Sequence, residues 1–520
     1  MTTSRAVLIG LLALTVVRIL IGAFGELSAD EAYYYLWSQH LAPSYYSKGP
    51  GIAWAIKAGT MIFGDTALGI RVLSPLLGLA TSLLFFRLGR ALFSEQTAAW
   101  AVLLLNLTPI FNAGSIVMTI DPLSVFFWTA ATLTLWRALH RANPFNLYWP
   151  LTGFLIGLGF LCKYTNAFQL LSILLLLTIS RRWRGQLKKP GLYLLLLVFA
   201  LCTIPVFVWN AQHEWITFTH LKERGSLDQA PGFNPLNFLT FFAGHFFTYS
   251  PLIFAGLVWA LILAAIRFGK DDSETFLFFF AAPIIAVYFV LSFNQAGELN
   301  WTAPGFITAG LLLPHFWQQS RLSERLKRNL RSATLLLAGL MSLLMMNTDV
   351  ARQLGAPWPY AFDFQSRLRG WQESATFLDD AVLAASKSLD SDIFLIANKY
   401  QTAAIHSFYM DPDTPVLQPT PHHPKVHIVE SANIQNQFSF WPRYDGLEFT
   451  GNRGDDPSSP FIGKHALYIT DNADGMSPPQ NIQRGFESWE VSGIVDVVRR
   501  GDLVRRLKVF TCYNYQGLAL

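Results

Sequence analysis

Charged residues are scarce in this sequence. Only 14% of its 520 residues are Asp, Glu, Lys or Arg, and 52% are hydrophobic, whereas a soluble globular protein usually has about 25% charged residues. A water-soluble core cannot bury so much Leu, Phe, Ile and Val, so the excess is expected to face lipid. The net charge is +5, but the basic residues lie in short clusters between apolar runs. This pattern is typical of cytoplasmic membrane loops and argues against nucleic-acid binding.

Cysteine is also rare, and the common phosphate-binding loops are missing. Cys162, Cys202 and Cys512 are the three cysteines; no pair has metal-ligand spacing, so neither a zinc site nor a disulfide framework is predicted. Neither GxGxxG nor GxxxxGKS/T occurs. His213 and Glu214 do not begin an HExxH motif, because Thr217 stands where the second histidine belongs. A nucleotide-binding fold and a zinc-protease site are therefore not expected.

Apolar runs predict about 11 to 13 transmembrane helices. A straight helix that crosses a bilayer needs about 20 apolar residues, and about 17 to 25 are tolerated. The first run could pass for a signal peptide, but its length and the acidic residues that soon follow favour an uncleaved span. The candidate spans are 6–24, 68–86, 97–110, 121–139, 148–161, 165–180, 191–209, 250–266, 275–292, 301–317 and 332–346.

Lys and Arg clusters predict the orientation of these spans. The clusters near Arg87, Arg137, Arg181, Arg267 and Arg321 occupy alternate loops, which are therefore expected to be cytoplasmic. The opposite loops hold nearly all of the unusual acidic and aromatic motifs. We expect a multi-pass protein of the cell inner (plasma) membrane, with a cytoplasmic N-terminus, an odd number of spans and a periplasmic C-terminal end.

The composition changes near residue 347, where runs long enough to span a membrane stop. Residues 1–346 are therefore predicted to form the membrane domain, and residues 347–520 an extracytoplasmic soluble α/β domain. Residues 392–396 and 466–470 are typical of short buried strands. Residues 365–387 favour a helix, and residues 496–512 favour two strands joined by a Gly-Asp turn at 501–502.

The first outer loop carries two adjacent carboxylates, Asp30 and Glu31, followed by Tyr33 and Tyr34. Helix capping by Ser28 or Asp30 explains the acids equally well, because acids favour the first turn of a helix. Capping does not explain the aromatic run, which suits a platform beside lipid and sugar.

Two lysines and an aspartate in outer loops are further candidates. Lys48 follows Tyr46 in a turn rich in Gly and Pro and suits a phosphate, although an ordinary interfacial lysine is the alternative. Asp121 precedes Pro122 and could be only an N-cap, but an acid at this depth is costly without a partner. Lys163 lies between two apolar runs and raises the same question.

Other polar residues lie in the later outer loops or within a span. Arg18 lies inside the first span, where we expect a buried partner. The remaining candidates for substrate binding, which combine polar and aromatic groups at the interface, are His213, Arg224, Asn300 and Trp301.

Taken in order, these motifs resemble a known family. The sequence is similar to the bacterial protein-mannosyltransferase-like and aminoarabinose-transferase-like glycosyltransferases, which have the GT-C fold. The motifs that carry the resemblance are Asp30-Glu31-Ala32-Tyr33-Tyr34, Tyr45-Tyr46-x-Lys48-x-Pro50, Asp121-Pro122, Lys163-Tyr164-Thr165, Trp209-Asn210-x-x-His213-x-Trp215 and Asn300-Trp301-x-x-Pro304. Ser47-Lys48-Gly49-Pro50 departs from the family's frequent Asp-His-Pro-Pro, which leaves the donor subgroup open.

The resemblance implies a function and roles for these residues. It implies sugar transfer with inversion from a polyprenyl-phosphate donor to a glycolipid such as lipid A, a polysaccharide or a protein. It makes Asp30 the catalytic acidic residue and Asp121 a second one, and it places the donor phosphate near Lys48 and Lys163. Glu31 could orient these groups or help hold a cation. No cofactor is required, although a divalent cation is possible and the metal is unknown.

Two other classes of function remain open. A transporter or flippase for a lipid-linked or anionic substrate would explain Arg18, but the polar motifs gather at one face rather than at the midplane. A membrane scaffold or sensor that binds a partner through residues 347–520 would leave the acidic and aromatic loops unexplained.

Overall fold

Two compact units make up the chain in the computed structural model, which describes residues 3–225, 232–356, 358–363, 365–446, 459–472 and 475–518. The first unit comprises Met1–Phe24 and Ala42–Asn347, and the second comprises Gly25–Leu41 and Thr348–Leu520. The predicted domains were 1–346 and 347–520. The structure divides the chain differently in one place, because residues 25–41 group with the C-terminal unit.

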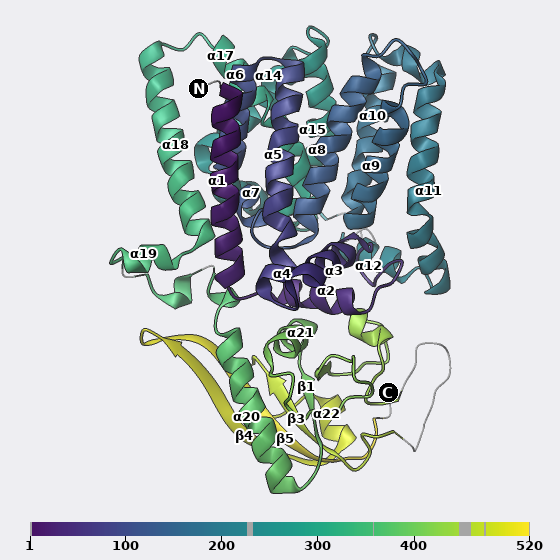
Figure 1. The fold of residues 1–520 in the computed structure, drawn as a ribbon, viewed down its shortest axis with the longest axis vertical. Coiled ribbons are helices and arrows are strands. Elements are labelled where there is room, and N and C mark those ends of the chain that lie inside the picture. Colours follow the sequence, from purple (N-terminus) through teal and green to yellow (C-terminus); the bar gives the residue numbers. More distant parts are fainter. Residues whose placement is uncertain are drawn as a thin grey trace. The chain divides into compact units, whose positions relative to one another are not determined.

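Helices form the regular structure of the described part of the first unit (Figure 1). They are α1 (Thr3–Phe24), α3 (Gly51–Phe63), α4 (Ala67–Arg71), α5 (Leu73–Leu92), α6 (Glu95–Asn106), α7 (Pro109–Gly114), α8 (Ile120–Leu139), α9 (Tyr148–Cys162), α10 (Phe168–Ile179), α11 (Pro190–Gln212), α12 (Ile216–Arg224), α13 (Pro235–Tyr249), α14 (Pro251–Ile266), α15 (Asp272–Leu291), α16 (Ala303–Ala309), α17 (Leu312–Gln319) and α18 (Glu324–Met346). Short 3₁₀ turns include η1 (Tyr164–Ala167) and η3 (Leu299–Thr302).

Polar residues between the apolar runs start several of these helices. The side chains of Ser94, Asp271 and Ser323 accept hydrogen bonds from first-turn N–H groups of α6, α15 and α18. Pro190 and Pro251 begin α11 and α14, a position where the missing N–H of proline costs nothing. Capping residues and prolines in the sequence therefore mark where α6, α11, α14, α15 and α18 begin.

Five helices among the described residues are long and apolar enough to cross a membrane, namely α1, the stretch Ala67–Leu92 that contains α4 and α5, α11, α15 and α18. The pair α13 and α14 gives a sixth if it counts as one span, although the chain bends by 114° between them. The chain is therefore a multi-pass membrane protein. Fewer helices meet this criterion than the 11 to 13 predicted, because other apolar runs, such as α3 and α9, are shorter than about 17 residues.

An aromatic core fills the interior of the first unit. Phe85, Trp136, Phe254, Phe276 and Phe306, from five different helices, belong to one cluster of buried apolar side chains. By contrast, few residues of α1, α11 and α18 are buried within the protein, as expected of helices that face lipid.

A five-stranded mixed sheet forms the centre of the second unit. Its order is β2-β1-β3-β5-β4; β1 is parallel to β2 and β3, and β5 is antiparallel to β3 and β4. The strands are β1 (Ile393–Ala397), β2 (Val426–Ile428), β3 (His465–Thr470), β4 (Phe486–Arg499) and β5 (Asp502–Tyr515), and the helices α2 (Ala29–Gln39), α19 (Asp349–Gln353), α20 (Trp371–Leu389), α21 (Tyr400–Tyr409) and α22 (Gln480–Gly485).

The predicted α/β domain is confirmed in its main elements. The strands expected at 392–396 and 466–470 are β1 and β3, and β4 is joined to β5 by a turn at Arg500-Gly501, one residue earlier than the expected 501–502, because Asp502 already pairs with Arg499. The helix expected from residue 365 begins later, at Trp371, because the chain first forms a separate 3₁₀ turn at Ser366–Leu368.

Candidate active site

Asp121 lies in the first turn of α8. The hydroxyl of Thr119, not Asp121, caps this helix and accepts a hydrogen bond from the N–H of Asp121 at 3.3 Å. The sequence had offered Asp121 as a possible N-cap before Pro122. Because the helix begins earlier, at Ile120, the carboxylate of Asp121 can bind other groups.

Two residues distant in sequence meet this carboxylate. Nζ of Lys163 donates to Oδ1 of Asp121 at 2.7 Å, and Nδ2 of Asn300 donates to Oδ2 at 2.7 Å. Nζ of Lys163 also donates to the backbone carbonyl of Asn300 at 3.2 Å. We call this arrangement the Asp121–Lys163–Asn300 cluster. It supplies the partner that an acid at membrane depth requires.

Neighbouring contacts fix the cluster in place. The side chain of Lys163 is only 6% exposed, whereas that of Asp121 is 23% exposed, so the lysine faces inward and the carboxylate keeps access to a ligand. Nδ2 of Asn166 in η1 donates to the backbone carbonyl of Ser124 in α8 at 3.0 Å. This bond ties the segment after α9 to the helix that carries Asp121.

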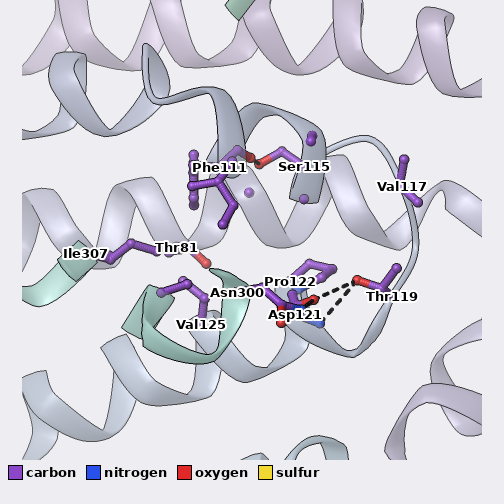
Figure 2. A pocket seen from close by; sticks show the side chains of 15 residues that line it. Thr81, Phe111, Ser115, Val117, Thr119, Asp121, Pro122, Val125, Asn300 and Ile307 are labelled. Atoms are coloured by element: carbon purple, nitrogen blue, oxygen red, sulfur yellow. Dashed lines mark hydrogen bonds between the residues drawn. The ribbon is translucent and has the colours of Figure 1, made fainter. Parts of the chain in front are cut away.

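A pocket of about 250 Å³ borders the cluster. Its walls are mostly apolar and include Phe111, Val125 and Ile307. Figure 2 shows Asp121 close to Asn300 and Thr119 on one side of this pocket, with Phe111 on the other. An apolar space with a carboxylate and an amide on one side suits a ligand that combines hydrocarbon with hydroxyl groups.

The Lys48 turn packs directly against the residues that precede Lys163. A Cβ atom on Gly49 would lie 2.3 Å from the carbonyl oxygen of Leu161, and one on Gly51 would lie 2.4 Å from Sγ of Cys162. Only glycine permits so close an approach. The structure therefore brings together the segments that carry the two lysines predicted to bind the donor phosphate.

Basic and aromatic side chains of α12 surround the same turn. The ring of Tyr46 lies 4.6 Å from that of His220, and the hydroxyl of Thr217 donates to the carbonyl of Tyr45 at 3.1 Å. Burial first, and then the positive charges of Lys48 and Arg224, together lower the pKa of His220 to about 4. His220 thus lies beside two cations as a neutral ring, and the sequence analysis missed it because no motif marks it.

Arg224 also contacts an acid that directly precedes η3. Its Nη2 lies 3.3 Å from Oε1 of Glu298, and both side chains are well exposed at 44% and 61%. Such an exposed pair contributes about 1 kcal/mol or less. An anionic ligand could therefore replace Glu298 as the partner of Arg224 at little cost.

The acidic pair Asp30 and Glu31, which follows α1, belongs to the second unit, on α2. Ser28 is the N-cap: its hydroxyl accepts from the N–H of Glu31, and the Glu31 carboxylate accepts from the N–H of Ser28 at 2.9 Å. This capping box employs Glu31, which is fully buried. Asp30 is exposed and is not the cap. The two acids therefore differ in role, and a catalytic role for Asp30 stays a prediction.

The tyrosines that follow are packed inside the second unit. Tyr33 and Tyr34 are 5% and 9% exposed, and the hydroxyl of Tyr33 accepts from the backbone N–H of Gln437 at 2.7 Å. The ring of Tyr33 also stacks parallel to that of Phe438. These contacts explain the aromatic run by packing, and sugar binding by Tyr33 and Tyr34 stays a prediction.

Two other predicted binding residues have packing partners in the first unit. The ring of His213 stacks on Trp209 at 3.9 Å, and its Nδ1 donates to the backbone carbonyl of Trp209 at 2.7 Å. Trp301 packs on Tyr288 at 5.2 Å between ring centroids. His213 lies between α11 and α12, and Trp301 is next to Asn300 in η3. A direct contact with substrate stays a prediction for each.

Arg18 has partners that are amides rather than acids. It is 1% exposed, and its guanidinium donates to Oδ1 of Asn106 at 3.0 Å and to Oδ1 of Asn112. Arg18 therefore has the buried partner that was expected, and two asparagines fill this role. The presence of Asn106 and Asn112 in a mostly apolar stretch was the signal that could have identified these partners.

A metal site is not formed by the described residues, since no three His, Cys, Asp or Glu side chains among them are arranged to hold an ion. The divalent cation expected as a possibility stays a prediction.

The chain is similar to known proteins in sequence and in fold. Residues 47–209 match the model of the dolichyl-phosphate-mannose-protein mannosyltransferase family. The crystal structure of ArnT from Cupriavidus metallidurans in the apo state matches with a TM-score of 0.63, at 15% identity and over 98% of both chains. The chain has the GT-C fold. The resemblance to this group of glycosyltransferases, which the motifs predicted, is confirmed.

Curated relatives of the GT-C chain include enzymes that modify lipid A or use a polyprenyl carrier. The lipid A galacturonosyltransferase RgtD of Rhizobium johnstonii is 28% identical over 286 residues, which cover 54% of this chain and 59% of that protein. An undecaprenyl phosphate-alpha-4-amino-4-deoxy-L-arabinose arabinosyl transferase of Pseudomonas savastanoi pv. phaseolicola is 28% identical over 162 residues, 30% of each chain. The matched part thus spans little more than half of the first relative.

Proposed function

We propose that this protein transfers a sugar, with inversion, from a polyprenyl-phosphate donor to an acceptor outside the cytoplasm. The GT-C fold and the relatives named above support the reaction class. The observation that carries the proposal is the packing of the Lys48 turn against the segment before Lys163. It gathers cations for a phosphate beside a carboxylate and an amide that suit sugar hydroxyls.

Lys48 and Arg224 are the proposed ligands of the donor phosphate. Tyr46, two residues before Lys48, packs on His220 of α12, and Arg224 ends the same helix. Lys48 is suited to this role as a compact charge on a glycine-restricted turn, and Arg224 as a planar donor of two hydrogen bonds. Release of Arg224 from the exposed Glu298 would accompany donor binding.

The Asp121–Lys163–Asn300 cluster is the proposed site for the sugar end of the donor. Asp121 keeps 23% of its side chain exposed while its charge is balanced by Lys163, so it can accept a hydrogen bond from a sugar hydroxyl without the cost of an unpaired acid. The apolar pocket beside it would then hold the first part of the hydrocarbon carrier.

The reaction needs few protein groups. The bond from the sugar C1 to the phosphate oxygen breaks, a bond from C1 to the acceptor oxygen forms, and polyprenyl phosphate departs as the leaving group. The acceptor hydroxyl loses its proton to a carboxylate, for which the motif resemblance favours Asp30. Cations that hold the departing phosphate stabilise the charge that develops on it.

The membrane and its sidedness are part of the proposal. The clusters of Lys and Arg in alternate loops support an inner-membrane protein with its N-terminus in the cytoplasm and its C-terminal unit in the periplasm. Relatives that act on lipid A favour a glycolipid acceptor, with polysaccharide and protein as alternatives.

The test compares cells with and without the protein by mass spectrometry of their glycolipids and envelope glycans. The expected result is one sugar mass that is missing from the deletion strain and returns with the native gene. It should not return with Lys48→Ala, which removes the phosphate ligand. An unchanged glycan profile, with accumulation of a lipid-linked substrate at the inner leaflet, would instead identify a flippase.

A further inference from the structure

A larger cavity lies at the other end of the membrane unit from Asp121. It has a volume of about 690 Å³ and lies between α6, α14, α17 and α18. The start of α6 borders it. Oε1 of Glu95 in that helix accepts from the N–H of Ser4 at 2.9 Å, so this end of α6 lies beside the start of α1, as the ribbon shows (Figure 1). The end of α1 instead contacts Ile116, shortly before α8 and Asp121.

The cavity has apolar walls and a basic rim. Its lining includes leucines of four helices together with Arg321 and Arg331, and none of the described residues that line it is acidic. The guanidinium of Arg331 lies 5.8 Å from the ring centre of Trp100. Its size falls within the range of about 300–1,000 Å³ typical of small-molecule sites.

The surroundings of the cavity indicate lipid rather than water. The lining helix α18 exposes Leu336, Leu340 and Leu343 by 45% to 76%, and α14 exposes Ile262 and Ile266 by 54% and 68%. Such surfaces are stable only against hydrocarbon. A ligand that enters between these helices would therefore come from the bilayer.

We propose that this cavity binds an anionic phospholipid. One acyl chain would lie along Leu104 and Leu263, and Arg321 and Arg331 would hold the phosphate. Basic pockets between membrane helices bind anionic headgroups in this way. The site goes beyond the proposed function and shares no residue with the Asp121–Lys163–Asn300 cluster.

The test measures lipid binding to the purified full-length protein by native mass spectrometry. Phosphatidylglycerol is titrated against protein in a neutral detergent, with phosphatidylcholine as the reference lipid. Arg321→Gln with Arg331→Gln should weaken phosphatidylglycerol binding about 30-fold, since each arginine contributes about fivefold to the affinity for an anionic lipid. The matched control is Arg325→Gln with Arg328→Gln, two exposed arginines nearby that do not line the cavity.

A second variant tests the apolar part of the site without changing charge. Ala255 lines the cavity, and Ala255→Trp should fill it and displace the lipid while the protein still inserts. Inorganic phosphate at millimolar concentration should not compete, because it lacks the chain. The proposal would be overturned if both arginine double variants lost phosphatidylglycerol binding equally, or if Ala255→Trp bound this lipid as well as the native protein does. Competition by inorganic phosphate alone would also overturn it. Tighter binding of polyprenyl phosphate than of phosphatidylglycerol would assign the cavity to a different lipid and would overturn it as well.

Discussion

Nζ of Lys163 lies 2.7 Å from Oδ1 of Asp121, although the two residues are 42 positions apart. The lysine is almost wholly buried and the carboxylate is not. The pair therefore has two possible uses: it can hold α8 to the segment after α9, and it can present an acid whose charge is already balanced. Measurements of stability and of sugar transfer in variants of the pair distinguish these two roles.

Lys163→Met should destabilise the protein more than its combination with Asp121→Asn. The single variant leaves a carboxylate without its cation at membrane depth, which costs about 3 kcal/mol when the group is mostly buried. The double variant removes both charges, so its thermal midpoint in detergent should recover most of the loss. Sugar transfer should stay low in the double variant. Recovery of transfer together with stability would show that the pair is only structural.

Asp30→Asn should abolish most transfer without unfolding the protein. Because Ser28 and Glu31 form the capping box, the capping explanation no longer applies to Asp30. Turnover should fall by about 10²- to 10⁴-fold if Asp30 accepts the acceptor proton. Transfer is measured in detergent with a purified polyprenyl-phosphate sugar, and the thermal midpoint should stay within about a degree of the native value.

Two neighbouring variants serve as controls for Asp30. Glu31→Gln keeps a side chain that can complete a capping box, so it should retain stability. Ser28→Ala removes the cap and should cost about 1 kcal/mol while it leaves the Asp30 carboxylate in place. Near-normal turnover by folded Asp30→Asn would remove this residue from the mechanism.

The sequence predicted the helices better than the membrane spans. The run 6–24 is α1 and the run 121–139 is α8 almost to the residue, because apolar length and flanking polar residues set both ends. The run 301–317 is instead divided into α16 and α17, and the bend of 114° after Tyr249 was not expected. Such breaks depend on packing between helices, which a hydropathy pattern does not contain.

The site was predicted in its residue types but not in its pairings. Outer-loop position identified Asp121, Lys163 and Asn300 separately, and the structure joins them through hydrogen bonds. His220 was missed because its place beside Lys48 depends on the packing of α12 against a turn 170 residues earlier. Tyr33 shows the opposite case, since an aromatic run that suggested sugar binding has partners within the second unit.

A C-terminal fusion should report a periplasmic location. The alternate Lys and Arg clusters require an odd number of spans, so alkaline phosphatase fused after Leu520 should be active and green fluorescent protein there should be dark. Fusions after Arg184, in a loop predicted to be cytoplasmic, should give the reverse pair of signals. Activity of the phosphatase at Arg184 and not at the C-terminus would invert the topology and place every proposed site residue on the wrong side.

Acid should destabilise the second unit through His406. This side chain is fully buried; its Nδ1 donates to the carbonyl of Thr402 at 2.8 Å, and its Nε2 lies 3.0 Å from the hydroxyl of Ser374. Burial, reinforced by the charge of Arg505, lowers the pKa of His406 to about 4. The unfolded chain takes up the proton near pH 6.5. Stability from this group is thus complete above about pH 7 and is lost as the pH falls from about 6.5 to about 4.

The size and place of this loss distinguish His406 from general acid effects. A pKa lowered from 6.5 to about 4 corresponds to about 3 kcal/mol across that window. Hydrogen exchange of α20 and α21, corrected for the intrinsic pH dependence of exchange, should therefore speed up between pH 7 and pH 4.5 in the native chain. His406→Gln lacks the titrating ring, so its exchange should be faster at pH 7 and should depend less steeply on pH than that of the native chain. The matched variant His423→Gln alters another buried histidine of the same unit whose pKa is lowered to about 4, and it should keep the part of the α20 response that depends on His406. An equally steep response in His406→Gln would assign the acid sensitivity to another group.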